Sequence, residues 1–139
     1  MKFTSILASI VLLPAFTLGV TVSYDQTYDN GGTSLTTVAC SDGPNGLITR
    51  GFSTFGSLPD FPNIGGAAAV EGWNSASCGS CWDLTYTNGQ GVSKTISVLA
   101  IDHADSGFNI ALAAMNELTG NQAQFLGRVD VTAVQVDSS

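Results

Sequence analysis

Three cysteines are the side chains of this sequence with the most distinctive chemistry. Cys78 and Cys81 stand three positions apart, and Cys40 lies well upstream. Three pairings are open within the chain, and each of them leaves one thiol unpaired. The Cys-x-x-Cys spacing is also typical of redox motifs, but Trp82 begins a strand pattern where a redox motif needs a helix. Because no common zinc motif has this spacing, we expect a structural disulfide, no metal and no cofactor.

The N-terminal segment has the pattern of an export signal. Lys2 gives it a positive start, and the apolar run that follows is too short to span a bilayer. We therefore expect a signal peptide over residues 1–19, cleavage before Val20, and one mature domain over residues 20–139. No later segment has the length of apolar sequence that a membrane span requires.

The charge balance is strongly acidic. The chain carries 4 basic and 11 acidic residues, for a formal net charge of −7. An acidic surface repels phosphate backbones, so we expect no nucleic-acid partner. Charged residues make up only 11% of the chain, so its surface polarity comes mainly from hydroxyl and amide side chains. Such a surface suits sugars, although it is also common among secreted proteins.

Glycines and other turn residues recur every eight to twelve residues, which favours a mainly β fold. Trp82, Leu84 and Tyr86 alternate with polar residues, and a turn at 88–91 predicts a hairpin. The apolar phase of the last strand changes at Ala133-Val134, which predicts a bulge or burial on both faces. The predicted strands cover residues 20–24, 35–39, 82–87, 95–101 and 129–136.

One helix is predicted over residues 109–118. Asn109 is the expected N-cap, and Gly120 is well placed to end the helix. One further helical turn is expected within 121–126. The prolines and glycines of residues 51–72 predict a long structured loop.

The aromatic side chains are expected to have mainly structural roles. Trp73 and Trp82 flank the cysteine pair, and we expect both rings in the core because large rings fill small barrels well. His103 is expected to be a solvated turn residue. Three phenylalanines are expected to pack within the long loop: Phe52, Phe55 and Phe61.

Ten short segments, taken in their order along the chain, resemble the cerato-platanin family of secreted fungal proteins. Each segment alone is a weak signal, but together they cover essentially the whole mature chain. The segments are residues 20–25, 38–43, 45–47, 61–66, 72–73, 77–82, 100–102, 107–109, 127–130 and 134–137.

The resemblance implies a fold and a set of partners. The implied fold is a mainly β, six-stranded double-psi β-barrel with short α-helices, similar to expansin domains. The implied location is extracellular, in some members at the cell wall. The implied activity is binding of chitin-type N-acetylglucosamine oligomers or other cell-wall polysaccharide, and loosening of polysaccharide networks without cleavage. Host defence or immune receptors are also implied as partners, since members act as elicitors and sometimes as allergens.

The resemblance also implies roles for the cysteines. It pairs Cys40 with Cys78, and it pairs Cys81 with a cysteine near the C-terminus that this sequence does not contain. Cys81 is therefore expected to be an unpaired thiol. It is either a buried, inert group or a handle for an intermolecular disulfide, so the expected state is a monomer or a dimer through Cys81.

Asp102, Gly107 and Asn109 match family residues on a shallow saccharide-binding surface. The residues alone leave Asp102 equally open to a turn-forming or helix-capping role. Two other functions remain open: an immunomodulatory or allergenic protein recognised directly by host receptors, with sugar binding incidental, and a weak glycoside hydrolase. Hydrolysis normally needs two carboxylates, and Asp105 and Asp83 are the available partners for Asp102.

Overall fold

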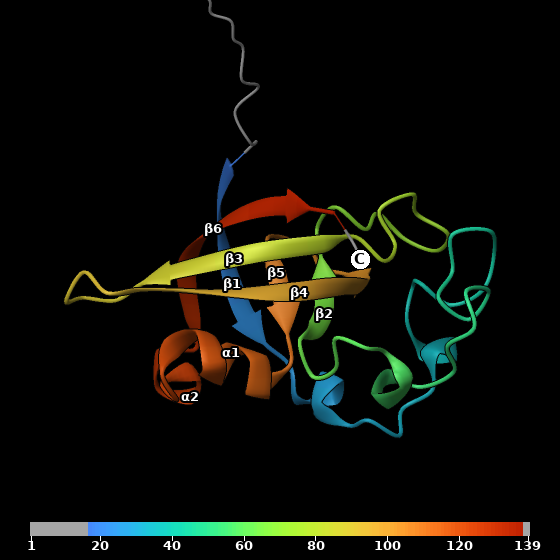
Figure 1. Cartoon of the computed structure of the whole chain (residues 1–139), viewed down its shortest axis with the longest axis horizontal. Coiled ribbons are helices and arrows are strands. Elements are labelled where there is room, and N and C mark those ends of the chain that lie inside the picture. Colours follow the sequence, from blue (N-terminus) through green and yellow to red (C-terminus); the bar gives the residue numbers. More distant parts are fainter. Residues whose placement is uncertain (1–16, 138–139) are drawn as a thin grey trace, which may run out of the picture.

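The computed structural model describes residues 17–137, which places most of the expected signal peptide outside the described residues. Residues 17–19 begin the first strand, and cleavage before Val20 stays a prediction. Figure 1 shows the elements in chain order, which are β1 (Thr17–Tyr24), η2 (Gln26–Asp29), η3 (Leu35–Thr37), η4 (Phe55–Ser57), β2 (Ile64–Ala67), β3 (Cys81–Thr87), β4 (Ser93–His103), β5 (Phe108–Ile110), α1 (Leu112–Thr119), α2 (Ala123–Leu126) and β6 (Arg128–Val136).

The six strands close into a barrel in the order β1-β5-β2-β4-β3-β6. Two neighbouring pairs are parallel, β1 with β5 and β2 with β4, and the other four are antiparallel. The two helices pack together against one end of this barrel (Figure 1). The predicted mainly β fold, a six-stranded barrel with short helices, is confirmed.

The β3–β4 hairpin forms where the alternating pattern predicts it. Trp82 and Leu84 are buried, and the tip of the hairpin projects from the barrel (Figure 1). The Asn88 side chain accepts hydrogen bonds from the backbone N–H groups of Gln90 and Val92, at 2.9 and 3.0 Å. An asparagine that bonds its own turn in this way fixes the hairpin locally, which is why the sequence pattern is sufficient here.

β2 lies inside the segment that was predicted to be a loop. Its sequence, Ile64-Gly-Gly-Ala67, has neither alternation nor strong strand formers. The glycines are needed because β2 is clamped between β4 and β5: a Cβ atom at Gly65 would meet the Asn109 carbonyl oxygen. Close backbone approach of this kind is the usual reason for glycine inside a strand. The loop prediction for residues 51–72 is therefore wrong at these four residues.

The predicted helix begins later than expected. Asn109 lies in β5, and α1 begins at Leu112. The Asp29 carboxylate caps this helix from a distant part of the chain, accepting from the N–H groups of Leu112 and Ala113 at 2.7 and 2.9 Å. Negative charge at a helix N-terminus is favourable, and here it comes through tertiary structure. Gly120 ends the helix in the left-handed conformation, as predicted.

One further strand prediction is wrong, and the structure decides between the two alternatives predicted for the last strand. Residues 35–37 form a short 3₁₀ helix capped by the Ser34 hydroxyl, which buries Leu35 without any strand pairing. β6 runs in continuous register with both β1 and β3, so no bulge accompanies the change of phase at Ala133-Val134. Ala133 is buried and Val134 is half-buried on the opposite face, which agrees with the other predicted alternative, burial on both faces.

The core lies inside the barrel and continues under the helices and the long loop. Phe55 is fully buried there, while Phe52 and Phe61 pack against the core from its edge, in agreement with the prediction for these rings. The largest fully buried side chains are Phe55, Leu35, Ile64, Leu84, Ile101, Ile110, Met115 and Leu118. Within residues 17–137, no helix has the length and apolar character needed to cross a membrane.

Candidate functional site

A row of residues crosses five neighbouring strands on the outside of the barrel. The strand registers place Asp102 opposite Gly66, Gly66 opposite Asn109, Asn109 opposite Ser23, and Ser23 opposite Arg128. Residues directly opposite one another in a sheet share a face. Most of the residues next to these along the strands are buried, among them Val22, Ile101, Phe108, Ile110 and Val129. We call the five aligned residues, from Asp102 to Arg128, the polar row. It brings Asp102 and Asn109 onto one surface although they come from different strands.

Asp102 is half-buried and tightly held. Its Oδ2 atom accepts from the Tyr28 hydroxyl at 2.9 Å, and Oδ1 accepts from the N–H groups of Ala39 and His103 at 3.0 and 2.9 Å. A carboxylate has about four acceptor positions, so these three bonds leave one for a ligand. Burial and the nearby Asp102 carboxylate raise the pKa of Tyr28, which keeps the phenol protonated as a donor.

Asn109 borders a polar hollow of about 260 Å³, which Asp102 itself does not line. Its Oδ1 atom accepts from the Ser23 hydroxyl at 2.9 Å, and Arg128 donates to the same Ser23 oxygen at 3.3 Å. Gly66 lies between Asp102 and Asn109 in the register and is itself buried, because a Cβ atom there would meet the His103 carbonyl oxygen. The hollow is lined by Ser23, His103, Ala104, Asp105, Ser106, Asn109 and Arg128.

Gly107 has a structural role next to this surface rather than a place in the hollow. Its φ is +55°, and a Cβ atom there would meet the carbonyl oxygen of Thr21 in β1. Only glycine suits a residue with this φ that lies so close to another strand. Gly107 thereby sets the parallel approach of β5 to β1, which places Asn109 beside Ser23.

His103 is exposed, as predicted, but it ends strand β4 rather than lying in a turn. Its Nδ1 atom lies 2.7 Å from the Val70 carbonyl oxygen, so Nδ1 carries the proton and donates. Its Nε2 atom lies 3.4 Å from Asp105, whose side chain is fully exposed. The ring therefore forms a wall of the hollow, with one polar edge turned toward solvent.

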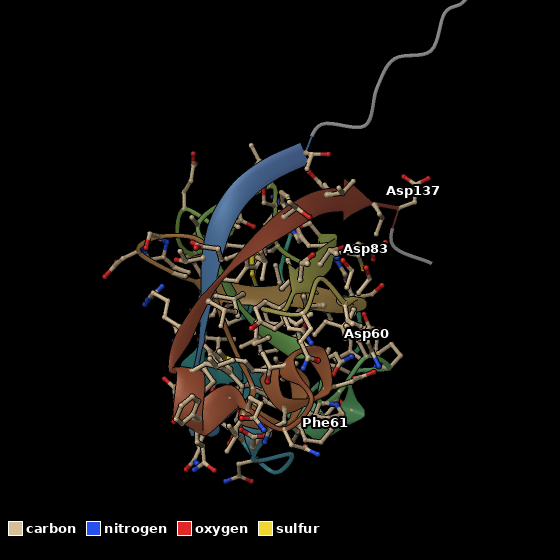
Figure 2. The ribbon with its side chains drawn as sticks, turned by 90° about the vertical axis from the view of Figure 1, so that its left-hand side faces the viewer. Asp60, Phe61, Asp83 and Asp137 are labelled. Carbon is tan, nitrogen blue, oxygen red and sulfur yellow. A yellow bond between two sulfur atoms is a disulfide. The ribbon has the colours of Figure 1, made fainter. Side chains whose placement is uncertain are left out.

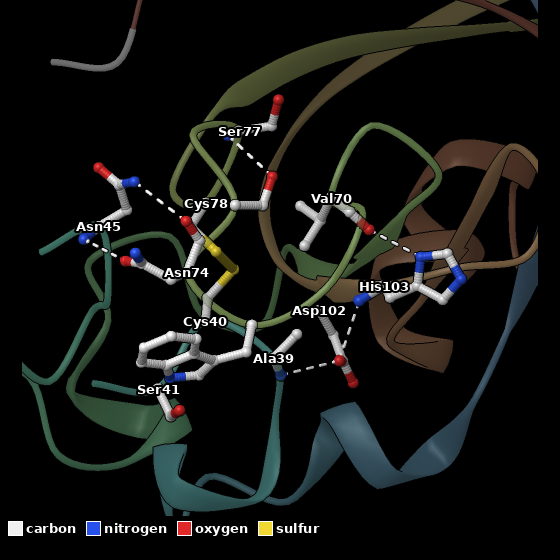
Figure 3. The surroundings of a disulfide bond; sticks show 12 residues. Ala39, Cys40, Ser41, Asn45, Val70, Asn74, Ser77, Cys78, Asp102 and His103 are labelled. Carbon is white, nitrogen blue, oxygen red and sulfur yellow. Dashed lines mark hydrogen bonds between the residues drawn. A yellow bond between two sulfur atoms is a disulfide. The ribbon is translucent and has the colours of Figure 1, made fainter. Parts of the chain in front are cut away.

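A disulfide joins the loops that support Asp102. Cys40 and Cys78, 5.4 Å apart at Cα, form the bridge that the resemblance implies, and both are buried (Figure 3). Cys40 follows Ala39, whose N–H group binds Asp102. The bridge therefore holds the backbone donor of the Asp102 site in place.

The two tryptophans differ in their surroundings. Trp82 is 7% exposed and packs edge-on against Phe108, as a core residue should. Trp73 is 62% exposed, so its prediction as a core residue is wrong. Its indole N–H donates to Asp42 at 2.7 Å, and this bond holds the pKa of Asp42 below its usual range. The position of Trp73 in a loop, next to a polar partner, explains why the ring stays outside.

Cys81 is the free thiol of the described chain, and it is half-buried. It borders a hollow of about 420 Å³, the same one that Asp60 and Asp137 line. Figure 2 shows Asp60, Asp83 and Asp137 on one side of the barrel. Burial, together with Asp60 and Asp83, raises the pKa of the Cys81 thiol because all three disfavour the thiolate. A dimer through Cys81 stays a prediction.

The raised pKa of Cys81 predicts slow chemistry at this thiol. Fewer thiolates are present at pH 8 than for an exposed cysteine, so alkylation by iodoacetamide is expected to be slow and to accelerate at higher pH. Asp60→Asn removes a nearby negative charge, and it is expected to raise the rate at pH 8 about two- to fivefold. The rates are measured by mass spectrometry. Asp137→Asn is the control in the same hollow, and equal rates for the wild type and Asp60→Asn would contradict this account.

Sequence reasoning missed four contributors to this surface: Tyr28, Ser23, Gly66 and Arg128. Tyr28 comes from a 3₁₀ turn, 74 positions from Asp102. No local pattern connects such residues, because strand registers bring them together. The adjacent glycines 65 and 66 are the one local signal, since paired glycines suggest close approach of backbones. Among the described residues, no group of acids, histidines and cysteines is arranged to hold a metal ion.

Comparison with known proteins shows that the chain matches one protein family. The cerato-platanin family model matches residues 20–139. An allergen homolog of Arthroderma benhamiae is 56% identical over 137 residues, which are 95% of this chain and 65% of that protein. The chain thus spans slightly less than two thirds of that relative. A heat-stable 19 kDa antigen of Coccidioides immitis is 47% identical over 146 residues, covering 100% of this chain and 97% of the antigen.

Solved structures agree with this assignment. The crystal structure of cerato-platanin 1 from M. perniciosa has a TM-score of 0.83 and 47% identity, over 85% of this chain and 95% of that one. The solution structure of the fungal elicitor cerato-platanin has a TM-score of 0.73 and 40% identity, over 85% and 92% of the two chains. The protein is a small disulfide-linked barrel with a polar outer surface. It belongs to the cerato-platanin family.

Proposed function

We propose that this is a secreted, non-hydrolytic protein that binds chitin-type N-acetylglucosamine oligomers or related cell-wall polysaccharide on the polar row. The observation that carries the proposal is the strand register that places the fixed carboxylate of Asp102 and the fixed amide of Asn109 on one surface, where Asn109 lines the polar hollow. The Cys40–Cys78 bridge supports an oxidising, extracellular location. Loosening of polysaccharide and association with the cell wall belong to the same proposal.

The groups on this surface suit the hydrogen bonds of a sugar. Asp102 offers its remaining acceptor position to a hydroxyl or to an acetamide N–H. The Asn109 amide group and the Arg128 guanidinium add donors at the polar hollow. Because Asn109 and Arg128 both bind Ser23, they are ordered before a ligand arrives, and little side-chain entropy is lost on binding.

The placement of the acids argues against glycoside hydrolysis. Asp83 pairs with Ser97, five residues before Asp102 along β4, which corresponds to roughly 17 Å at the rise of a strand. Glycosidases hold their two carboxyl groups within about 5 to 9.5 Å. Asp105 is directed toward His103 in open solvent, while Asp102 faces Tyr28 and Ala39. A carboxyl pair across one bond is therefore not favoured.

The test is depletion of the purified mature protein from solution by insoluble chitin, with cellulose as a second polymer. We expect saturable depletion that N-acetylglucosamine oligomers reverse. Asp102→Asn is expected to weaken binding about tenfold, because hydrogen bonds to a charged group contribute about 1.5 to 3 kcal/mol. Thermal unfolding shows whether the variant remains folded.

Asp137→Asn is the matched control, since it removes the same charge at the Cys81 hollow. No depletion of the wild type by chitin beyond that of an unrelated acidic protein would overturn the proposal. A folded Asp102→Asn protein that binds as the wild type does would remove Asp102 from the site. Release of reducing ends from the polymer would favour the hydrolase instead.

The second candidate function is direct recognition by host defence or immune receptors, with sugar binding incidental. The names of the relatives favour it, since they include an allergen homolog, an antigen and an elicitor. Asp102→Asn separates the two functions. Full activity of this variant in an immune-cell or leaf-necrosis assay, together with lost chitin binding, would favour receptor recognition.

A further inference from the structure

Trp73 presents an indole ring to solvent in a fixed position. Tryptophan is usually well buried, as Trp82 is here, and Trp73 is 62% exposed. A single exposed apolar side chain is ordinary, so exposure alone indicates nothing. What distinguishes Trp73 is how firmly the structure holds it and where it lies.

The ring is held through both its side chain and its backbone. Its Nε1–H donates to Asp42 at 2.7 Å, and the ring edge at Cζ2 lies against Gly43. The next residue, Asn74, has a left-handed backbone, and its two polar oxygens accept from the backbone and side chain of Asn45 at 2.9 and 3.0 Å. The indole is therefore ordered in advance, which reduces the entropy lost when a ligand binds.

Two segments connect Trp73 with the polar row. In the first segment, the Ala39 N–H group binds Asp102, and Asp42, three residues later, binds the Trp73 indole. In the second segment, the Val70 carbonyl oxygen binds His103, and Trp73 follows three residues later. Three residues span at most about 11 Å, so Asp42 and Trp73 each lie within that reach of a residue that contacts Asp102 or His103. Figure 3 shows His103, Asp102 and Ala39 leading to the disulfide and on to Asn74.

We propose that Trp73 is an outer subsite of the same surface, on which one sugar ring of a longer N-acetylglucosamine oligomer stacks. This inference rests on the proposed function. The flat apolar face of the indole matches the C–H face of a sugar ring. The neighbouring side chains, Asp42, Asn45 and Asn74, are polar and supply acceptors and donors for the hydroxyl and acetamide groups at the ring's edge.

The test compares short and long oligomers by titration calorimetry with the mature protein. The wild type is expected to bind the hexamer more tightly than the trimer. Trp73→Ala is expected to weaken the hexamer about tenfold and the trimer less than twofold, in line with stacking of rings on aromatic side chains. Trp73→Phe keeps a flat ring without the bond to Asp42, and it is expected to retain most of the hexamer affinity.

Phe125→Ala is the matched control, since Phe125 is also an exposed aromatic residue and lies in α2. An unchanged hexamer affinity in Trp73→Ala would overturn the subsite while leaving the proposed function intact, and it would assign the ring to a protein partner instead. Equal losses for trimer and hexamer in a folded variant would overturn the outer position. Absence of binding by the wild type to either oligomer would overturn the proposed function and this subsite together.

Discussion

Replacing Cys40 and Cys78 by alanine is expected to lower the free energy of unfolding by about 4 kcal/mol, from the entropy of closing a loop of this length. The two cysteines are 38 positions apart, and both are buried. The loss would be a large share of the roughly 5 to 15 kcal/mol that stabilises a small domain. It would also loosen Ala39, which binds Asp102, so ligand binding is expected to weaken as well.

The experiment is denaturation by guanidinium chloride in a Cys81→Ala background, which prevents exchange with the free thiol. The parent Cys81→Ala protein is the control, and because Cys81 is only half-buried and unpaired, it is expected to be about as stable as the wild type. A loss below about 1 kcal/mol on removal of the bridge would show that packing, not the crosslink, holds these loops.

Gly107→Ala is expected to lower the free energy of unfolding by about 3 kcal/mol, as a strained backbone and a steric clash add together. The residue has a φ of +55°, and its added methyl group would meet the Thr21 carbonyl oxygen. The clash forces β5 away from β1, and it separates Asn109 from Ser23. Gly107 is therefore expected to act on the proposed sugar-binding surface through the fold.

Gly120→Ala is the matched control for this effect. Gly120 also has a positive φ, +67°, but no atom lies within 4 Å of the position a Cβ would take. Its substitution is expected to lower stability by only about 1 kcal/mol, which is the penalty of the left-handed conformation. Equal losses for the two variants would show that the contact with β1 carries no energy.

Local patterns were sufficient where short-range interactions decide the structure. The β3–β4 hairpin follows from alternation and from an asparagine that bonds its own turn. The end of α1 follows from Gly120, which adopts the left-handed conformation that glycine takes most readily. The burial of Trp82 follows from its place in the alternating strand.

Sequence-based predictions were wrong at residues whose contacts come from distant parts of the chain. Asn109 resembles an N-cap, but Asp29 caps α1 across 83 positions. Residues 64–67 resemble a loop, but they pair on both sides and become a central strand. Trp73 was predicted to lie in the core, but its loop places it at the surface. In each case the local residues are compatible with several structures, and pairing or packing selects one.

The sequence by itself determined the family, the barrel class and the identity of Asp102, Gly107 and Asn109 as residues to examine. These follow from residue types in a fixed order, which the chain carries without reference to its folded shape. Only the tertiary structure decided that Tyr28, Ser23 and Arg128 join them, that Gly107 supports the surface from behind, and that Trp73 lies exposed outside the core. Strand register and loop anchoring set these relations, and both depend on contacts between residues far apart in the chain.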